Sequence, residues 1–337
     1  MKETSLAIIG TGAWGVTLAV HVAGLGVPVT LLARTDDEAA ALADAGGSPR
    51  MPAVRFPAGL AVSADAERVL PHAAVVLLAP PAQTMRANVR RLRPFLRPEQ
   101  VLVSCSKGLE LGTALRMSQV ITQEAPALEG RVAALSGPNL AREIAARKPS
   151  STVVACPDEA LARQVQGLLM APHMRVYTHT DIVGVELGGA LKNVIALGAG
   201  MCDGLEAGDN AKAAFMTRGL AEMARLAKAA GAEPLTLAGL AGLGDLLATC
   251  MSPLSRNRTA GEQLARGRSL AEIQAEMQQV VEGVPTTVAA LQLARRYGVE
   301  MPITELMHRV LFEGLSPVAA GELLMQRDPK AELEGIL

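Results

Sequence analysis

A glycine motif near the N-terminus constrains the fold of this chain more than any other feature. The apolar run Leu6–Ile9 leads directly into GTGAWG (Gly10 to Gly15), and a helical stretch from Val16 to Leu25 follows. In such a strand–turn–helix unit the first glycine permits a tight turn, the second admits a pyrophosphate and the third allows close packing. The helix start also offers backbone N–H groups and the positive end of the helix dipole. The motif therefore predicts a dinucleotide-binding unit rather than a merely structural turn.

The first half of the sequence alternates short apolar runs with helical stretches. We expect strands at Leu6–Ile9, Val29–Ala33, Leu60–Ser63, Ala74–Ala79, Val101–Ser104, Val132–Leu135, Ser151–Ala155 and Arg175–Thr178. Apolarity within these runs is continuous rather than alternating, which is typical of parallel strands covered on both faces. This half therefore predicts an α/β domain of the doubly wound Rossmann type.

After about Thr180 the strand patterns stop and helical patterns take over. Residues 211–230 place apolar side chains at helical spacing before Gly231, which suits a helix end. Ser269 with Glu272 three residues later is a capping-box signature. We expect residues 1–180 to form a dinucleotide-binding domain and residues 181–337 to form an all-α domain for substrate binding and catalysis.

The first helix expected in the second half contains a lysine in an otherwise small or apolar stretch. Between Ile182 and Cys202 the only formal charges are Glu186 and Lys192, so the helix should be packed on most sides. Burial favours the neutral amine, which can take or give a proton at working pH. We interpret Lys192 as a catalytic acid/base. For a lone lysine, a stem extended to the surface or a pairing with a buried carboxylate is the commoner arrangement.

Composition narrows the classes of partner. The formal net charge is −1 and no basic run has interleaved aromatic residues, which argues against nucleic acid and anionic membrane surfaces. The four cysteines are widely spaced and the five histidines form no HExxH-like cluster, so we expect reduced thiols, a cytoplasmic location and no metal. We see no signal-peptide pattern and no run of about 20 uncharged apolar residues, so we expect no membrane span.

The end of the second expected strand bears on the choice of cofactor. Leu32 and Ala33 are followed by Arg34, Thr35 and Asp36. An NAD-selective site usually carries a carboxylate here for the ribose hydroxyls, whereas an arginine can hold the 2′-phosphate of NADP. Arg34 therefore favours acceptance of NADP, Asp36 weakens the inference, and the preference between NADP and NAD stays open.

Several separated motifs together resemble the NAD(P)-dependent glycerol-3-phosphate dehydrogenases of bacterial type. The motifs are GTGAWG from Gly10, SCSKGLE from Ser104, SGPNLAREIA from Ser136, DIVGVELGGALKNVIALGAG from Asp181, GLAGLGDLLATC from Gly239, SPLSRNR from Ser252 and VVEGV from Val280. They extend from residue 6 to about residue 290 in the family's order and spacing. The resemblance implies reversible hydride transfer between NAD(P)H and dihydroxyacetone phosphate, which gives sn-glycerol 3-phosphate for glycerophospholipid synthesis.

The resemblance also implies roles for individual residues. Lys192 would exchange a proton with the substrate oxygen, Lys107 would contact substrate and cofactor, and Asp245 would orient the substrate and Lys192. The implied substrate contacts are Lys107, Gly137, Asn139, Lys192, Asp245, Ser255, Arg256 and Asn257, the last three holding the phosphate. The implied cofactor contacts are Gly10, Gly12, Ala13, Trp14, Gly15, Arg34, Thr35, Lys107, Ala141, Arg256, Val280 and Glu282.

Each of these residues also has a structural interpretation. Lys107 suits a solvated loop, Asp245 a helix N-cap, and Trp14 simple packing under the glycine loop. The SRNR sequence suits an ordinary polar turn. The chain also departs from the family pattern, because Asn139 replaces the usual Ser or Thr and Leu32 replaces an aromatic residue.

Other classes of protein share parts of this pattern. Ketopantoate reductases and β-hydroxyacid dehydrogenases also combine two domains with a lysine on a C-terminal helix, but they act on carboxylates. A non-catalytic NADP-sensing protein would keep only the glycine loop. This chain also retains Lys107, Lys192 and Asp245, which favours an enzyme over a non-catalytic protein. The SRNR sequence favours a phosphate substrate over a carboxylate. The oligomeric state stays open, with a homodimer as one candidate.

Overall fold

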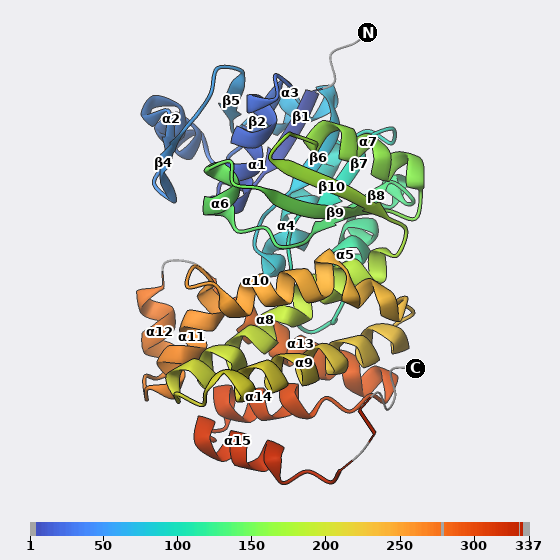
Figure 1. The fold of residues 1–337 in the computed structure, drawn as a ribbon. Helices are drawn as coiled ribbons and strands as arrows, with labels where there is room; N and C mark the ends of the chain where they lie inside the picture. The colour runs from blue at the N-terminus through green and yellow to red at the C-terminus, as the bar shows by residue number, and fades with distance from the viewer. Residues whose placement is uncertain (1–4, 278–279, 330, 333–337) are drawn as a thin grey trace. The chain divides into compact units, whose positions relative to one another are not determined.

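The computed structural model describes residues 5–277, 280–329 and 331–332, and the chain divides into two compact units. The sheet unit contains the residues up to Ser106 together with Met117–Ile182. The helical unit contains Lys107–Arg116 and the chain from Val183 onward. Figure 1 shows strands flanked by helices in the first unit and helices in the second. From the sequence we expected a single boundary near residue 180. The structure adds residues 107–116 to the helical unit, which that boundary did not foresee.

The sheet unit is built on eight strands in the order β10-β9-β8-β7-β6-β1-β2-β5. They are β1 (Ser5–Ile9), β2 (Val29–Leu32), β5 (Leu60–Ser63), β6 (Ala73–Leu78), β7 (Val101–Ser104), β8 (Val132–Ser136), β9 (Ser150–Ala155) and β10 (Met174–His179). Neighbouring strands are parallel except β8 and β9. The strand order runs outward in both directions from β1, so the crevice at its carboxyl end is the expected ligand site. The Rossmann-type prediction is confirmed.

Helices and short turns connect the strands. The helices are α1 (Ala13–Gly24), α2 (Asp36–Ala45), α3 (Ala66–Val69), α4 (Met85–Leu92), α5 (Met117–Glu124), α6 (Ala141–Ala145) and α7 (Glu159–Leu169). The 3-10 turns are Leu70–His72, Ala82–Thr84, Arg93–Phe95 and Pro126–Leu128. A separate ribbon of β3 (Gly47–Ser48) and β4 (Met51–Arg55) escaped prediction because most of β4 is exposed and shows no buried apolar run.

The helical unit follows the patterns read from the sequence. It contains α8 (Ile182–Gly204), α9 (Asp209–Ala229), α10 (Asp245–Met251), α11 (Arg256–Ala265), α12 (Leu270–Glu276), α13 (Gly283–Tyr297), α14 (Pro302–Phe312) and α15 (Pro317–Met325). A 3-10 turn at Pro234–Ala238 and a π-helical turn at Leu240–Gly244 precede α10. The predicted capping box is confirmed, since Ser269 and Glu272 exchange backbone and side-chain hydrogen bonds at the start of α12.

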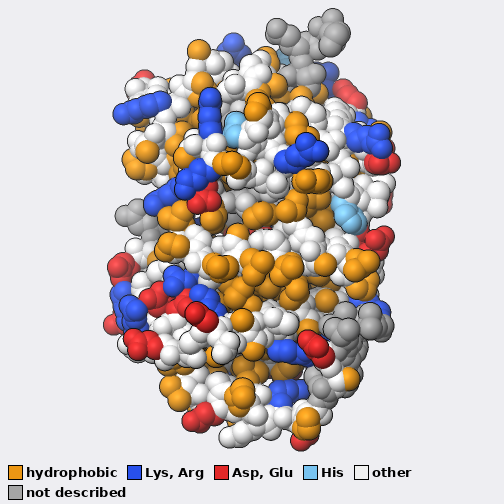
Figure 2. All heavy atoms as spheres, in the orientation of Figure 1, with side chains coloured by type: hydrophobic (Ala, Val, Ile, Leu, Met, Phe, Trp, Pro, Cys, Tyr) orange, Lys and Arg blue, Asp and Glu red, His pale blue; other side chains and the backbone are white. Residues whose placement is uncertain are grey.

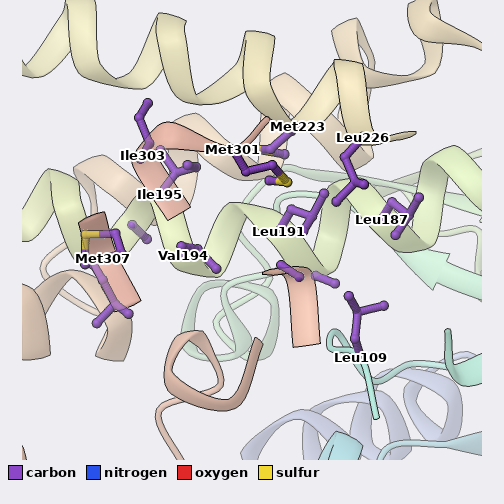
Figure 3. Close-up of a cluster of buried hydrophobic side chains, with 14 of the residues drawn as sticks. Leu109, Leu187, Leu191, Val194, Ile195, Met223, Leu226, Met301, Ile303 and Met307 are labelled. Carbon is purple, nitrogen blue, oxygen red and sulfur yellow. The ribbon is translucent and has the colours of Figure 1, made fainter. Parts of the chain in front are cut away.

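Helix α8 lies in the core of the helical unit. Its Leu191 and Ile195 pack in one cluster with Met223 and Leu226 of α9, and Leu109 extends toward α8 from the 107–116 segment (Figure 3). By length and apolarity α8 is the one described helix that could cross a membrane, but 89% of its apolar window is buried inside the fold. This burial is typical of the core helix of a globular domain.

Glycines bring α8 and α11 into backbone contact. A methyl group at Gly200 would lie 1.9 Å from the carbonyl oxygen of Arg258, and one at Gly261 would lie 1.8 Å from that of Leu197. Real side-chain atoms do not tolerate such distances, so both positions require glycine. The contact fixes the SRNR segment at the start of α11 against the helix that carries Lys192.

The surface of the helical unit also exposes apolar side chains. On the face drawn in Figure 2, hydrophobic side chains gather around the position of α10, while basic and acidic side chains are mixed over the rest. Leu247, Met251 and Leu254 are large apolar residues in or just after α10 that are exposed.

Candidate active site

The glycine loop at the end of β1 forms an open cradle. Gly10 has a φ of +110°, and a methyl group there would lie 2.8 Å from the carbonyl oxygen of Ala79. A methyl group at Gly15 would lie 1.9 Å from the carbonyl oxygen of Gly10, whereas one at Gly12 would meet nothing within 4 Å. Gly12 caps α1 without a side chain, so the first-turn N–H groups of α1 face this space. The loop therefore fits a pyrophosphate.

A carboxylate contacts the glycine loop from α2. The Thr11 hydroxyl donates to Glu38 Oε1 at 2.6 Å, and the Arg34 backbone N–H donates to Glu38 Oε2 at 3.1 Å. Burial acts to raise the pKa of Glu38, but hydrogen bonds from Thr11 and Arg34 and the charges of Arg34 and Arg50 keep it below its usual value. The sequence analysis considered Asp36 as the carboxylate at the end of β2 and missed Glu38. Both residues lie in the first turn of α2, and the sequence does not show which of them reaches the glycine loop.

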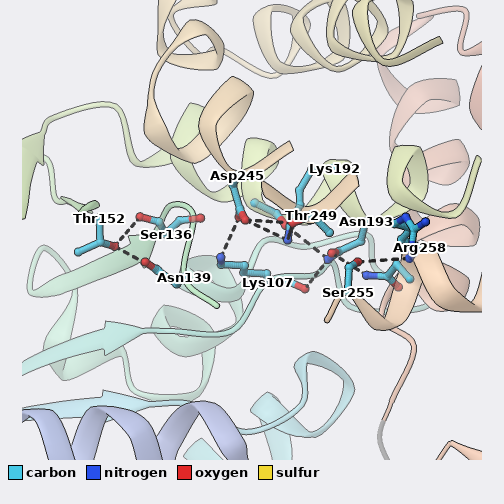
Figure 4. A network of polar contacts seen from close by, with 12 residues as sticks. Lys107, Ser136, Asn139, Thr152, Lys192, Asn193, Asp245, Thr249, Ser255 and Arg258 are labelled. Carbon is cyan, nitrogen blue, oxygen red and sulfur yellow. Dashed lines mark hydrogen bonds and ion pairs between the residues drawn. The ribbon is translucent and has the colours of Figure 1, made fainter. Parts of the chain in front are cut away.

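The end of β8 carries two of the predicted substrate residues. Gly137 has a φ of +137° and packs closely on Thr152 of β9. Asn139 Nδ2 donates to Thr152 Oγ1 at 3.0 Å, and that hydroxyl donates to the Ser136 carbonyl at 2.8 Å (Figure 4). Because the Thr152 proton is already used, the Asn139 amide must present its NH2 group to Thr152. Asn139 Oδ1 is then left buried with no donor among the described residues.

Two lysines and one aspartate meet in the helical unit. Asp245 Oδ2 accepts from Lys107 Nζ at 2.8 Å, and Asp245 Oδ1 lies 3.1 Å from Lys192 Nζ (Figure 4). The Lys192 ammonium also donates to Thr249 Oγ1 at 2.6 Å. Lys107 is mostly shielded from solvent rather than part of a solvated loop, and Lys192 is buried rather than extended to the surface. Lys192 does pair with a buried carboxylate, as the structural alternative required.

Local backbone geometry explains how these groups converge. A methyl group at Gly188 of α8 would lie 2.7 Å from the Ala241 carbonyl oxygen, so glycine lets the π-helical turn approach α8. The turn leads into α10, where Asp245 and Thr249 are four residues apart and therefore share a face. Asp245 is the first residue of α10 rather than its N-cap, which is Gly244. The N-cap interpretation of Asp245 is therefore wrong.

The electrostatics of this group suit proton transfer. Burial lowers the pKa of Lys192 to about 8, Asp245 opposes this shift, and the nearby ammonium of Lys107 adds to it. With both lysines protonated, the group carries one positive charge in excess. An excess positive charge in a buried site stabilises an oxyanion, and an amine that titrates near neutral pH can donate or accept a proton.

Side-chain amides connect the SRNR segment to Lys107. The Gly283 N–H donates to Asn257 Oδ1 at 2.9 Å, and Asn257 Nδ2 donates to Asn193 Oδ1 at 2.9 Å. Asn193 Nδ2 then donates to the Lys107 carbonyl at 3.4 Å. Each amide is oriented by the preceding donor. Sequence reasoning assigned no role to Asn193 or to Thr249, although the spacing of Thr249 from Asp245 was a usable signal.

The remaining predicted residues of the helical unit lie close to this network. Ser255 caps α11 by accepting from the Arg258 N–H at 3.2 Å, and it is buried rather than part of a solvated turn. Arg256 donates to the Val280 carbonyl at 2.9 Å, which brings together two residues expected at the cofactor. Glu282 caps α13. The predicted site residues thus form one group at the carboxyl edge of the sheet and one group in the helical unit.

A Rossmann-type unit with a glycine cradle and a helical unit with a buried Lys–Asp–Lys group define the class of nicotinamide-dependent dehydrogenases. Residues 5–162 match the family model for the N-terminus of NAD-dependent glycerol-3-phosphate dehydrogenase, and residues 181–322 match the model for its C-terminus. The chain therefore belongs to the NAD-dependent glycerol-3-phosphate dehydrogenase family. The resemblance stated from the motifs is confirmed.

Individual relatives agree with this membership. The chain is 50% identical over 336 residues to glycerol-3-phosphate dehydrogenase (NAD(P)+) of Streptomyces coelicolor, covering 98% of this chain and 99% of the relative. It is 48% identical over 335 residues to the protein of the same name from Thermobifida fusca, covering 99% and 100%. A crystal structure of glycerol-3-phosphate dehydrogenase from Coxiella burnetii superimposes with a TM-score of 0.92 at 35% identity, covering 97% and 100%.

Proposed function

We propose that the protein catalyses reversible hydride transfer between NADPH or NADH and C2 of dihydroxyacetone phosphate, giving sn-glycerol 3-phosphate. The observation that carries this proposal is the buried group of Lys107, Asp245 and Lys192 in a chain of this family. The sheet unit would serve as the dinucleotide-binding domain. The helical unit would serve as the domain for substrate binding and catalysis.

The glycine cradle supports the assignment of the cofactor. Gly10, Gly12 and Gly15 leave room for a pyrophosphate, and the first-turn N–H groups of α1 would bind its oxygens. Arg34, Thr35 and Glu38 would face the adenosine ribose, while Ala141, Arg256, Val280 and Glu282 would complete the cofactor contacts. When bound, NADPH or NADH supplies the hydride that reaches C2.

The helical unit would control the proton and the charge on the reacting oxygen. Reduction of a ketone places negative charge on its oxygen, so cations held there act most strongly in the transition state. The Lys192 ammonium would donate its proton to this oxygen and regain one from water, while Lys107 adds a second positive charge. Asp245 holds both amines, and Thr249 accepts from Lys192 and thereby fixes its direction. In the oxidation direction the neutral Lys192 amine would accept the proton.

The phosphate of the substrate would bind at the start of α11. The backbone N–H groups of the first turn and the Arg256 guanidinium suit a dianion, and Ser255 and Asn257 add polar groups at the same end. Gly137 and Asn139 would border the rest of the substrate. A charged group remote from the reacting carbon allows its binding energy to hold that carbon in place.

A spectrophotometric assay tests this function directly. Oxidation of NADPH or NADH is followed with dihydroxyacetone phosphate, with unphosphorylated dihydroxyacetone and with ketopantoate. We expect turnover with the first substrate and little with the other two. Comparable rates with and without the phosphate would refute the phosphate site, and a preference for ketopantoate would refute the substrate class.

The cellular setting is part of the same proposal. All four cysteines are thiols, and three of them are buried, which suits the reducing cytoplasm. The product would feed glycerophospholipid synthesis. A homodimer is proposed as the oligomeric state, and sedimentation of the purified protein at several concentrations would distinguish it from a monomer.

A further inference from the structure

The segment Lys107–Arg116 is a hairpin that closes on itself. Leu109 and Arg116 form an antiparallel bridge, and the Glu110 N–H donates to the Leu115 carbonyl at 2.9 Å. The turn contains Gly112 with a φ of +81° and Ala114 with a φ of +54°. A left-handed alanine persists only where its surroundings fix the backbone. Because the two arms of the hairpin are bridged, the position of Arg116 determines the position of Leu109 and of the residues just before it.

The tip of the hairpin is attached to the helical unit. Leu109 and Ala114 are buried in the same core as α8. From α13, Gln292 Nε2 donates to the Gly112 carbonyl at 2.7 Å and Arg296 donates to the Thr113 carbonyl at 2.9 Å. The hairpin therefore belongs to the unit that contains Lys192 and Asp245, although its neighbours in sequence belong to the sheet unit.

An ion pair attaches the base of the hairpin to α8. Arg116 NH1 lies 2.5 Å from Glu186 Oε2, and the two side chains are 14% and 7% exposed. Glu186 is the only formal charge besides Lys192 between Ile182 and Cys202. A buried ion pair is weak evidence for stability, because desolvation offsets much of the attraction. Its presence on an otherwise apolar helix therefore needs another explanation.

We propose that Arg116 and Glu186 are positioning residues, which hold the base of the hairpin on α8 and so keep Lys107 beside Asp245. The bridge from Arg116 to Leu109 carries this constraint to within two residues of Lys107. At the same time α8 itself carries Lys192, so one helix fixes both lysines around the shared carboxylate. The expected effect on turnover rests on the proposed function, whereas the position of Lys107 does not.

The first test replaces Glu186 by glutamine, which keeps the shape and removes the charge. Acetic anhydride labels exposed amines, and peptide mass spectrometry reads the label at each lysine. We expect labelling of Lys107 to increase several-fold in Glu186→Gln, because an amine released from Asp245 is more accessible. This readout needs neither substrate nor cofactor.

The second readout is the pH profile of turnover with dihydroxyacetone phosphate. The groups that face Lys192 are Asp245, Lys107, Thr249 and Cys250. When Lys107 leaves this group, Lys192 loses a neighbouring positive charge and keeps the negative charge of Asp245, so the pKa of Lys192 should rise. The alkaline limb of the reduction profile should therefore move to higher pH. Turnover should fall about tenfold, because a substitution far from the reacting atoms that displaces a catalytic group by about 1 Å can cost up to about a hundredfold in rate.

The control is Glu124→Gln in the sheet unit, where Glu124 pairs with Arg86 at 2.8 Å and is similarly shielded. It should lower the melting temperature and change neither Lys107 labelling nor the pH limb. Arg116→Lys in the otherwise wild-type chain, which keeps the charge opposite Glu186, should retain much of the wild-type behaviour. If Glu186→Gln does not fold, Arg116→Gln removes the other charge of the same pair and is assayed in the same way.

The outcomes separate the two proposals. A folded Glu186→Gln protein with wild-type Lys107 labelling and pH profile would overturn the positioning role. Increased labelling of Lys107, in a chain whose wild type does not reduce dihydroxyacetone phosphate, would support the positioning role and refute the proposed function.

Discussion

Lys192 is the residue whose replacement should separate chemistry from folding most clearly. In Lys192→Met we expect turnover to fall by about 10² to 10⁴, the usual contribution of a positioned acid or base. The melting temperature should stay the same or rise, because methionine avoids desolvating a cation and Asp245 keeps its pair with Lys107. Turnover, thermal stability and NADPH affinity are measured on one preparation. Near-normal turnover in the folded variant would contradict the acid/base role.

The pKa of Lys192 predicts opposite pH dependences for the two directions of the reaction. With that pKa lowered to about 8, reduction needs the ammonium and should decline above pH 8, whereas oxidation needs the amine and should increase through the same range. Because the unfolded amine has a pKa of 10.5, the unfolded chain binds the extra proton between these values. Stability contributed by Lys192 should therefore increase with pH across this window. Parallel profiles in both directions would argue against proton transfer by Lys192.

Arg34 and Glu38 should have opposite effects on the choice of cofactor. Arg34→Gln should raise the Michaelis constant for NADPH more than that for NADH, since a lost charge-assisted contact is worth about 1.5–3 kcal/mol, or tenfold and more. Glu38→Gln keeps an acceptor for Thr11 but removes a negative charge near the glycine loop, so it should lower the constant for NADPH. Equal changes for both cofactors in either variant would place that residue outside the ribose site.

At the residue scale, the sequence predicts those site residues that differ clearly from their neighbours in the chain. Lys192 stands out because its helix has almost no other charge, and the glycine loop stands out because its spacing has one chemical explanation. Asn193 and Glu38 do not stand out, since asparagine and glutamate are common in helices for structural reasons, and Thr249 is marked only by its spacing from Asp245. Their importance depends on which helix faces which, and that is decided by tertiary packing.

At the scale of elements, the contact between α8 and α11 is the most sensitive joint in the helical unit. Gly200→Ala would place a methyl group 1.9 Å from the Arg258 carbonyl oxygen, so α11 must shift with its SRNR segment. We expect a loss of stability of about 1–3 kcal/mol, typical of overpacking, together with an increased Michaelis constant for dihydroxyacetone phosphate. Thermal unfolding and steady-state kinetics provide the measurements.

The matched control is Gly321→Ala in α15, where an added methyl group meets nothing within 4 Å. Alanine favours a helix over glycine by about 1 kcal/mol, so this change should be neutral or stabilising and should leave the kinetics unchanged. If both glycine variants behave alike, the tight contact at Gly200 does not control the position of α11.

Elements were predicted well where apolarity is continuous. All eight strands of the main sheet lie within a residue or so of the expected ranges. Buried parallel strands such as β1, β6 and β7 leave an unbroken apolar run, whereas β5 and β10 are partly exposed. The antiparallel pairing of β8 and β9 was not foreseen, since apolar runs do not reveal strand direction. The hairpin at residues 107–116 was also missed, because its turn residues give no sign of the core that receives Leu109.

At the scale of the whole molecule, the chain passes between its two units three times, after Ser106, Arg116 and Ile182. A fragment of residues 183–337 therefore lacks Leu109 and Ala114, which fill part of its core. We expect this fragment to unfold at lower urea concentration than the same fragment with residues 107–116 joined ahead of it by a flexible linker. Identical unfolding midpoints would mean that the hairpin adds little to the helical core.

The large-scale organisation follows from the sequence in outline only. The change from strand to helix patterns near Thr180 locates the last passage between units, and the motifs together identify the family. The two earlier passages leave no mark in composition or periodicity, because a ten-residue hairpin is too short to establish a pattern of its own.

The chain contains one tryptophan and two tyrosines, and the tryptophan, Trp14, is the second residue of α1, directly beside the glycine loop in sequence. Tryptophan emission overlaps the absorption band of reduced nicotinamide, so a nucleotide bound at the glycine loop should quench it by energy transfer. Intrinsic fluorescence thus becomes a site-specific optical reporter that needs no label and leaves every side chain in place. Because the chain has no second tryptophan, all of its tryptophan emission comes from the region where the cofactor is expected to bind.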